Sequence, residues 1–272
     1  MTWGNTRRGH SPLCKSVEKM AIPPFLSRNH LGENMNDSII IDQKYCGFLE
    51  RGNGGYVCGT AARYIKGTAQ VTLWKPPPLD TPLDVERIDD RVLFKDGDVI
   101  VIEARPSSID LNIPSPPTYE EAMEASRLSL ALAHDPPSPD CFVCGCNRAK
   151  NEGLRVFAGP VGDNGIVAAP WTPYSSLADD SGVVKREFLW SVLDCPGGYA
   201  FLNNGIPAIV LGRLVADVKE KIKPGERCVV IGWKLSTDGR KLFSGSALFS
   251  DSGELCGMAK ATWFPMKGGD DL

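Results

Sequence analysis

The residues with the clearest chemical potential lie in one apolar stretch, Glu187–Tyr199 (EFLWSVLDCPGGY). Apolar residues cover more than one side of this stretch, which predicts a helix surrounded by other structure. Asp194, the acid near its end, must there be hydrogen-bonded, paired with a charge or used in catalysis. Pro196 and the glycines behind it predict a kink or a restart of the helix near Asp194. Two interpretations stay open: Asp194 caps the restarted helix, or it is catalytic.

Histidine is nearly absent from the parts of the chain that we expect to form the core. The three histidines, His10, His30 and His134, all lie outside segments that are typical of helices or strands. A Ser-His-Asp triad, a Cys-His pair or a histidine-bound zinc ion is therefore not expected. Acid–base chemistry would depend on carboxylates, tyrosines, lysines or thiols.

The nine cysteines are an odd number, and several lie in apolar segments. This pattern predicts reduced thiols in a cytoplasmic protein rather than a disulfide framework. Cys141, Cys144 and Cys146 (CFVCGC) have part of the spacing of a zinc ribbon, but no second cysteine pair or histidine follows at ligand spacing. We therefore expect no metal site and no cofactor. Cys195 could act as a nucleophile, although a thiol in an apolar helix is usually inert packing.

The charge and hydropathy of the chain indicate which classes of partner it can bind. The 272 residues include 30 basic and 33 acidic side chains, for a net charge of −3. No basic stripe indicates binding to nucleic acid. No apolar run approaches the ~20 residues that a membrane-spanning helix needs. We expect neither nucleic acid nor a membrane as a partner.

The first part of the chain divides into a tail and a first structural unit. Residues 1–35 are basic and lack an apolar run, so we expect a disordered or artefactual N-terminal tail, with an organelle-targeting signal as the alternative. Residues 36–105 predict a short strand, a helix and then four strands separated by turn residues. The predicted ranges are 38–43 for the first strand, 56–65 for the helix, and 70–74, 83–87, 91–94 and 99–104 for the four strands.

The second part repeats this order. Residues 106–140 form a proline-rich linker in which Thr118 and Glu121 predict a capping box and a helix to about residue 133. Residues 141–268 predict a hairpin, a long helix and four strands. The predicted ranges are 154–161 and 165–171 for the hairpin, 187–203 for the helix, and 209–221, 227–236, 241–250 and 254–264 for the strands. The fold class is therefore α+β.

Three pairs of similar segments, which occur in the same order in both halves, support an internal repeat. GGY occurs at residues 54–56 and again at 197–199, WKPPPL at 74–79 matches IKPGE at 222–226, and DGDVIVIEA at 96–104 matches DSGELCGMA at 251–259. Together with CFVCG, GLRVF and LWSVLD, these motifs resemble the hotdog-fold acyl-CoA thioesterase superfamily, in particular thioesterase-like proteins with two repeats in one chain. The resemblance implies a double hotdog, in which each repeat is an antiparallel sheet wrapped around a central helix.

The resemblance also implies a split site. In this superfamily a glycine-rich helix start from one unit polarises the thioester carbonyl, and a carboxylate on the helix of the other unit attacks it or activates water. Asp194 matches the carboxylate, whereas residues 185–187, where the glycines should lie, contain none. The first half has Asn53, Gly54 and Gly55 at a helix start, with Ala62 at the position of the acid. We therefore expect one complete site, built from the glycines of the first half and the acid of the second, and one inactive site that lacks both. If the two GGY triplets are aligned instead, the glycines and the acid no longer fall at matching positions of the two halves, and no composite site is implied.

The implied function is hydrolysis of an acyl-CoA or a related acyl thioester. Tyr56, Trp190 and Arg213 are candidate substrate-binding residues, although Tyr56 and Trp190 also fit a core and Arg213 fits a solvated strand face. The alternative is a non-catalytic acyl- or CoA-binding hotdog protein, and a dehydratase would need a histidine that the chain does not supply. The expected partners are the thioester substrate and a second copy of the two-repeat chain in a homodimer.

Overall fold

The computed structural model describes residues 37–48, 51–219 and 221–266. The expected N-terminal tail, residues 1–35, lies outside the described residues. No helix within these ranges is long and apolar enough to cross a membrane.

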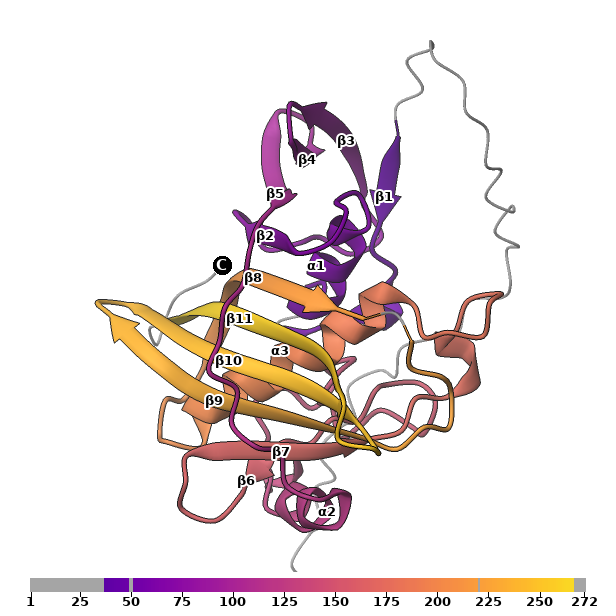
Figure 1. Ribbon diagram of the computed structural model, residues 1–272. Helices are drawn as coiled ribbons and strands as arrows, with labels where there is room; N and C mark the ends of the chain where they lie inside the picture. The colour runs from indigo at the N-terminus through magenta and orange to yellow at the C-terminus, as the bar shows by residue number, and fades with distance from the viewer. Residues whose placement is uncertain (1–36, 49–50, 220, 267–272) are drawn as a thin grey trace, which may run out of the picture. The chain divides into compact units, whose positions relative to one another are not determined.

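In the N-terminal half, residues 37–48 and 51–106 form a short strand and an α-helix followed by antiparallel strands, as the turn residues predicted (Figure 1). Gly97 adopts φ +56° between the last two of these strands, a left-handed conformation that glycine reaches without steric cost. The elements are β1 (Ser38–Ile40), η1 (Gln43–Tyr45), α1 (Gly54–Ala62), β2 (Ala69–Leu73), β3 (Pro82–Ile88), β4 (Arg91–Asp96) and β5 (Val99–Pro106).

The C-terminal half has the long helix and the four long strands that its apolar pattern predicted. Its elements, with those of the connecting segment, are α2 (Tyr119–Arg127), η3 (Leu130–Leu132), β6 (Gly159–Pro160), β7 (Ile166–Trp171), η4 (Ser175–Leu177), α3 (Arg186–Leu202), β8 (Ile209–Val218), β9 (Cys228–Asp238), β10 (Lys241–Ser250) and β11 (Leu255–Pro265).

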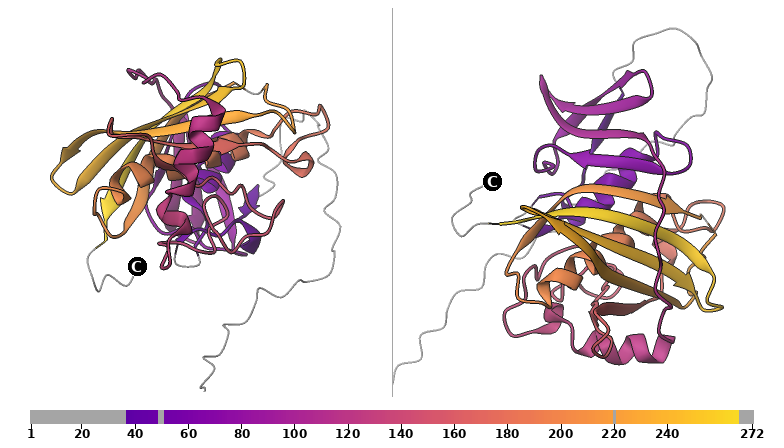
Figure 2. Two further views of the ribbon diagram at one scale, coloured as in Figure 1. Left: turned by 90° about the horizontal axis from the view of Figure 1, so that it is seen from below. Right: turned by 60° about the vertical axis from the view of Figure 1, so that its left-hand side comes forward.

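The strands of the described residues form one 11-stranded sheet, in the order β1-β3-β4-β5-β2-β8-β11-β10-β9-β7-β6. Every neighbouring pair is antiparallel. The strands of the two halves meet where β2 pairs with β8, in a register that places Ala69 opposite Ala216 and Thr72 opposite Arg213. The views in Figure 2 show the strands of the N-terminal half continuing the sheet of the C-terminal half.

Helix α3 is buried along most of its length and lies against β8–β11 (Figure 1). It continues through Pro196, so the predicted restart near Asp194 is wrong. The proline instead marks a close approach of helix and sheet: a Cβ at Gly232 of β9 would lie 2.2 Å from the Pro196 carbonyl oxygen. The hydroxyl of Ser246 in β10 donates to the Leu193 carbonyl at 2.6 Å, so the sheet supplies a donor close to the proline.

Helix α2 covers the opposite face of the sheet. Thr118 forms the predicted capping box with Glu121, but the α-helix ends at Arg127. Ala122 packs in a second apolar cluster with residues of β7, β9 and β10, among them Ile231. The segment between the halves is therefore partly folded onto the sheet.

The predicted strand at residues 154–161 is wrong except for Gly159–Pro160. Its first residues bond to the cysteine-containing loop instead: the Leu154 N–H donates to the Phe142 carbonyl, and the Val156 N–H donates to the Val143 carbonyl, both at 2.8 Å. These donors are therefore not available to a neighbouring strand.

The two α-helices α1 and α3 pack directly on each other through glycines of α1. A Cβ at Gly55 would lie 2.5 Å from the Cβ of Asp194, and a Cβ at Gly59 would lie 2.6 Å from the Cα of Glu187. Real side chains do not approach backbone so closely, so only glycine permits this crossing.

We expect Gly59→Ala to lower the free energy of unfolding by about 1–3 kcal/mol, because the added methyl group meets the backbone of α3 and forces the helices apart. Urea denaturation followed by circular dichroism measures this loss.

Gly198→Ala is the matched control in α3. Its Cβ would meet only the side chains of Trp263 and Ile209, at 3.2 Å and more, and alanine is the better helix former by about 0.5–1 kcal/mol. This variant should be neutral or more stable. A Gly59→Ala protein as stable as the wild type would contradict the glycine-dependent crossing.

Candidate functional site

Asp194 is the centre of the candidate site. Its side chain is buried and points at the start of α1, where its Oδ2 accepts a hydrogen bond from the Gly55 N–H at 2.8 Å. The amide of Asn53 lies 3.4 Å from the same oxygen. Asp194 therefore bonds to the helix of the other half of the chain and not to its own helix. Its Oδ1 has no hydrogen-bond partner among the described residues.

The start of α1 is fixed by Asn53, its N-cap residue. The Asn53 side-chain oxygen accepts from the Tyr56 N–H at 2.9 Å, while the amide nitrogen of the same side chain faces Asp194. The Gly55 N–H is used by Asp194, and no partner within the described part of the chain is assigned to the Gly54 N–H. A helix start with a free N–H group favours a negative charge or a polarised carbonyl oxygen.

Burial raises the pKa of Asp194 to about 7. The hydrogen bonds from the Gly55 N–H and the Asn53 amide stabilise the carboxylate and so lower its pKa. The nearby Cys141 raises the pKa further. A carboxyl group with such a pKa can both accept and release a proton near neutrality.

A cavity of about 310 Å³ opens beside these groups. Both halves of the chain line it, with Asn53, Gly54 and Asp194 at one wall. Most of the remaining wall is apolar or small, and it includes Leu73, Pro76, Pro77, Gly198, Leu202, Ile209, Leu211, Trp263 and Phe264. The cavity thus has a mainly apolar lining with a few polar and charged groups, Arg51 and Lys75 among them, as is typical of ligand sites.

The candidate substrate-binding residues do not line this cavity. Trp190 is fully buried in the core, and Tyr56 stacks on Tyr45 with ring centroids 3.8 Å apart. Arg213 donates from its Nε to the Thr72 hydroxyl at 3.1 Å, across the β2–β8 junction.

At the expected inactive site, formed by Ala62 and residues 185–187, no carboxylate accepts a hydrogen bond from a glycine N–H among the described residues. Ala62 is buried at the end of α1, and Arg186 at the start of α3 donates to the Gly67 carbonyl at 2.5 Å. Arg63 and Glu187 form an ion pair there, with 4.0 Å between the Arg63 guanidinium nitrogen and the Glu187 carboxylate oxygen. The two ends of the helix pair therefore differ chemically.

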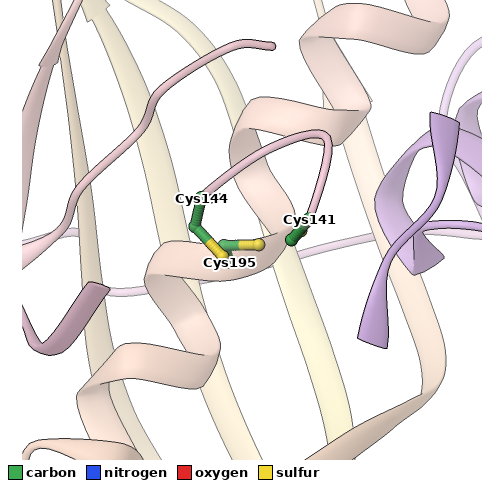
Figure 3. A group of neighbouring side chains, drawn as sticks. All are labelled: Cys141, Cys144 and Cys195. Carbon is green, nitrogen blue, oxygen red and sulfur yellow. The ribbon is translucent and has the colours of Figure 1, made fainter. Parts of the chain in front are cut away.

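The structure adds a group that sequence spacing did not bring together. The sulfurs of Cys141, Cys144 and Cys195 lie within 4.8 Å of one another, at the wall of the same cavity (Figure 3). Hydrogen bonds from the thiols of Cys144 and Cys195 hold the pKa of Cys141 well below its usual range. Cys195 is 51 residues from Cys144 in the chain, so a search for ligand pairs at short spacing could not find it.

The arrangement of the chain is similar to solved structures with the hotdog fold. None of the protein-family models matches the sequence, and no curated protein matches it either. A structure of the tesB protein of Mycobacterium avium subspecies paratuberculosis aligns with a TM-score of 0.51 and 15% identity, over 80% of this chain and 88% of that one. A proposed thioesterase of Novosphingobium aromaticivorans aligns with a TM-score of 0.55 and 11% identity, over 85% and 95% of the two chains.

A third structure supports the same fold. A protein of Alicyclobacillus acidocaldarius with a hot dog fold aligns with a TM-score of 0.54 and 11% identity, over 85% of this chain and 93% of that one. The chain therefore has the hotdog fold, as its motifs indicated. At these identities the likeness shows the fold and not the activity.

We expect Asn53→Ala to lower the free energy of unfolding by about 1–2 kcal/mol, because it removes the cap of α1 and a donor to a buried carboxylate. Thermal and urea unfolding measure the change. Asn53→Ser, which keeps a capping oxygen, should retain most of the stability. Equal losses in both variants would contradict a capping role.

Proposed function

We propose that the protein hydrolyses an acyl-CoA or a related acyl thioester at one composite site between two hotdog repeats. The first repeat would comprise residues 36–105 and the second residues 141–268, with residues 106–140 as the linker. The observation that carries the proposal is the contact of the Asp194 carboxylate with the start of α1 at the wall of a mainly apolar cavity. The structural likeness to thioesterases supports this assignment.

In the proposed reaction Asp194 acts as the general base. The Gly55 N–H and the Asn53 amide hold its Oδ2. Its Oδ1 is buried and has no hydrogen-bond partner among the described residues, and it would accept the proton from a water molecule that enters with the substrate. The water oxygen attacks the thioester carbonyl carbon, and the C–S bond then breaks. The leaving thiolate takes the proton from Asp194. The products are a carboxylic acid and a thiol.

The Gly54 N–H is the proposed donor to the carbonyl oxygen. It lies at the first position of α1, beside the amide that holds Asp194, and it lines the cavity. Negative charge develops on the carbonyl oxygen during attack, and a fixed N–H at a helix start stabilises that charge. Asn53, Gly54, Gly55 and Asp194 would thus form one catalytic unit in which Gly55 positions the base.

The cavity suggests how the acyl group is held. Its apolar lining residues Leu73, Leu202, Leu211 and Phe264 suit a hydrocarbon chain, with the thioester beside Gly54 and Asp194. Tyr56, Trp190 and Arg213, which lie outside this wall, would act on substrate only indirectly. No cofactor takes part in the proposed hydrolysis, and the remaining proposals are a homodimer of the chain and a cytoplasmic location.

The alternative function is non-catalytic binding of an acyl group or CoA. One observation favours it: the Gly55 N–H, a candidate donor for the carbonyl oxygen, is already occupied by Asp194. A binding protein would keep the cavity and would use this contact only to join α1 to α3. Thiol release from a panel of acyl-CoAs, together with calorimetric binding, separates the two functions.

We expect Asp194→Asn to lower kcat by at least about a hundredfold, because asparagine has the shape of aspartate but cannot take up the proton from water. Thiol release from acyl-CoAs measures the rate, and near-ultraviolet circular dichroism checks the fold.

Glu187→Gln is the matched control, because Glu187 is a second buried acid of α3 that lies away from the cavity. Its rate should stay within about threefold of the wild type. Full activity in Asp194→Asn, or equal losses in both variants, would rule out Asp194 as the base.

We expect Gly54→Pro to lower kcat about a hundredfold or more relative to Gly54→Ala, because proline lacks the N–H that would stabilise the oxyanion. Proline suits the first helical position, and Asn53 already has the extended conformation that a following proline requires (φ −59°, ψ 129°).

Gly54→Ala places the same Cβ against Leu211, so comparing the two variants isolates the N–H from the steric effect. Steady-state kinetics on both variants measures the difference. Equal rates in both would show that another group stabilises the carbonyl oxygen.

A further inference from the structure

Three buried cysteines from two separate segments converge beside the cavity. Cys141 and Cys144 lie in the loop before β6, and Cys195 lies in α3 (Figure 3). Their sulfurs are within 4.8 Å of one another. In a tetrahedral zinc site with Zn–S bonds of about 2.3 Å, neighbouring sulfurs are about 3.8 Å apart. A contraction of about 1 Å or less would therefore complete a three-thiolate site.

The loop that carries Cys141 and Cys144 is held rigidly. The Gly145 N–H donates to the Cys141 carbonyl at 2.8 Å, which closes a tight turn around the two cysteines. A Cβ at Gly145 would lie 2.4 Å from that carbonyl oxygen, so the turn requires glycine. The Phe142 N–H bonds to the Cys46 carbonyl at 2.8 Å and anchors the loop to the N-terminal half.

Hydrogen-bond donors surround the sulfurs. The Asn53 amide lies 3.6 Å from the Cys141 sulfur, and the backbone N–H groups of Val143 and Cys144 also favour its thiolate. The Tyr199 hydroxyl donates to the sulfur of Cys144. Donors to ligand sulfurs orient them and spread their charge, as the outer shell of a metal site does.

We propose that Cys141, Cys144 and Cys195 bind one zinc ion as three thiolate ligands, with the fourth coordination position facing the cavity. All three cysteines line the cavity, so a water molecule or a ligand atom can reach that position. The sequence alone led to the opposite expectation because only Cys141, Cys144 and Cys146 were close enough along the chain to be considered together. The fold replaces Cys146 with Cys195.

Charge and chemistry favour zinc over other cations. Three thiolates around Zn²⁺ leave a net charge of −1, whereas Cu⁺ would leave −2 in a buried place next to Asp194, where burial makes excess charge costly. Hard cations such as Mg²⁺ and Ca²⁺ require oxygen ligands and do not suit thiolates. Zinc binding must displace the thiol protons of the cluster, so it is linked to proton release.

The first test is the metal content of the full chain. The protein is produced in zinc-supplemented medium, freed of any affinity tag, purified under reducing conditions without chelator, and measured by inductively coupled plasma mass spectrometry. We expect about one zinc ion per chain. Cys141→Ser, Cys144→Ser and Cys195→Ser should each reduce bound zinc to background.

Cys146→Ser is the matched control, because Cys146 lies in the same loop but outside the cluster, and it should keep the full zinc content. Reconstitution of metal-free, reduced wild-type protein with Co²⁺ gives a second readout. We expect an intense thiolate-to-cobalt charge-transfer band that is lost in Cys195→Ser.

Wild-type protein that carries no zinc and takes up no cobalt overturns the proposal, even where a cysteine variant fails to fold. Bound copper in place of zinc, or unchanged zinc in Cys195→Ser, also overturns it. These readouts do not depend on thioester hydrolysis, so this proposal and the proposed function can fail separately.

Discussion

The crossing of α1 and α3 is the contact on which the other features depend. Gly55 and Gly59 let the two backbones approach so closely that no side chain fits between them. The same approach brings the first turn of α1 to the Asp194 carboxylate, which loses its water and receives the Gly55 N–H instead. The hydrogen bond compensates part of the cost of burying this group, so separating the helices would leave an unsatisfied donor and acceptor inside the protein. The site therefore forms only when the two halves of the chain pack against each other.

Helix α3 contacts a different neighbour with each of several successive residues. Asp194 faces α1, Cys195 faces the cysteine loop, Gly197 lies against Ser244 of β10, and Gly198 lines the cavity. Successive residues of a helix point about 100° apart. A helix that is surrounded on nearly all sides has little face left for solvent, which explains why its sequence is mostly apolar and its one-sided pattern is weak.

Pro196 lies inside α3, although its type and its neighbours predict a break in the helix. A proline inside a helix removes one backbone donor, and the residues behind it are glycines, which together favour a break in an isolated peptide. In the folded chain β9 and β10 press against this segment, with Gly232 next to the Pro196 carbonyl and Ser246 donating to Leu193. The absence of side chains at the glycines allows the close approach, and the packing keeps the helix continuous.

The sequence by itself determined most of the helices and strands and their order, because hydrophobic periodicity, turn residues and caps act over a few neighbouring residues. The exception is the strand predicted at residues 154–161, of which only Gly159–Pro160 forms. It also indicated Asn53, Gly54, Gly55 and Asp194 as members of one site, through their resemblance to a split motif. Only the tertiary structure decided that Asp194 bonds to the Gly55 N–H, that Tyr56 and Trp190 pack away from the cavity, and that Cys195 joins Cys141 and Cys144. The Gly55–Asp194 contact joins residues 139 positions apart, and Cys195 lies 51 and 54 positions from Cys144 and Cys141. Which of them meet depends on where two helices cross and how a loop folds over them, and no spacing along the chain encodes that geometry.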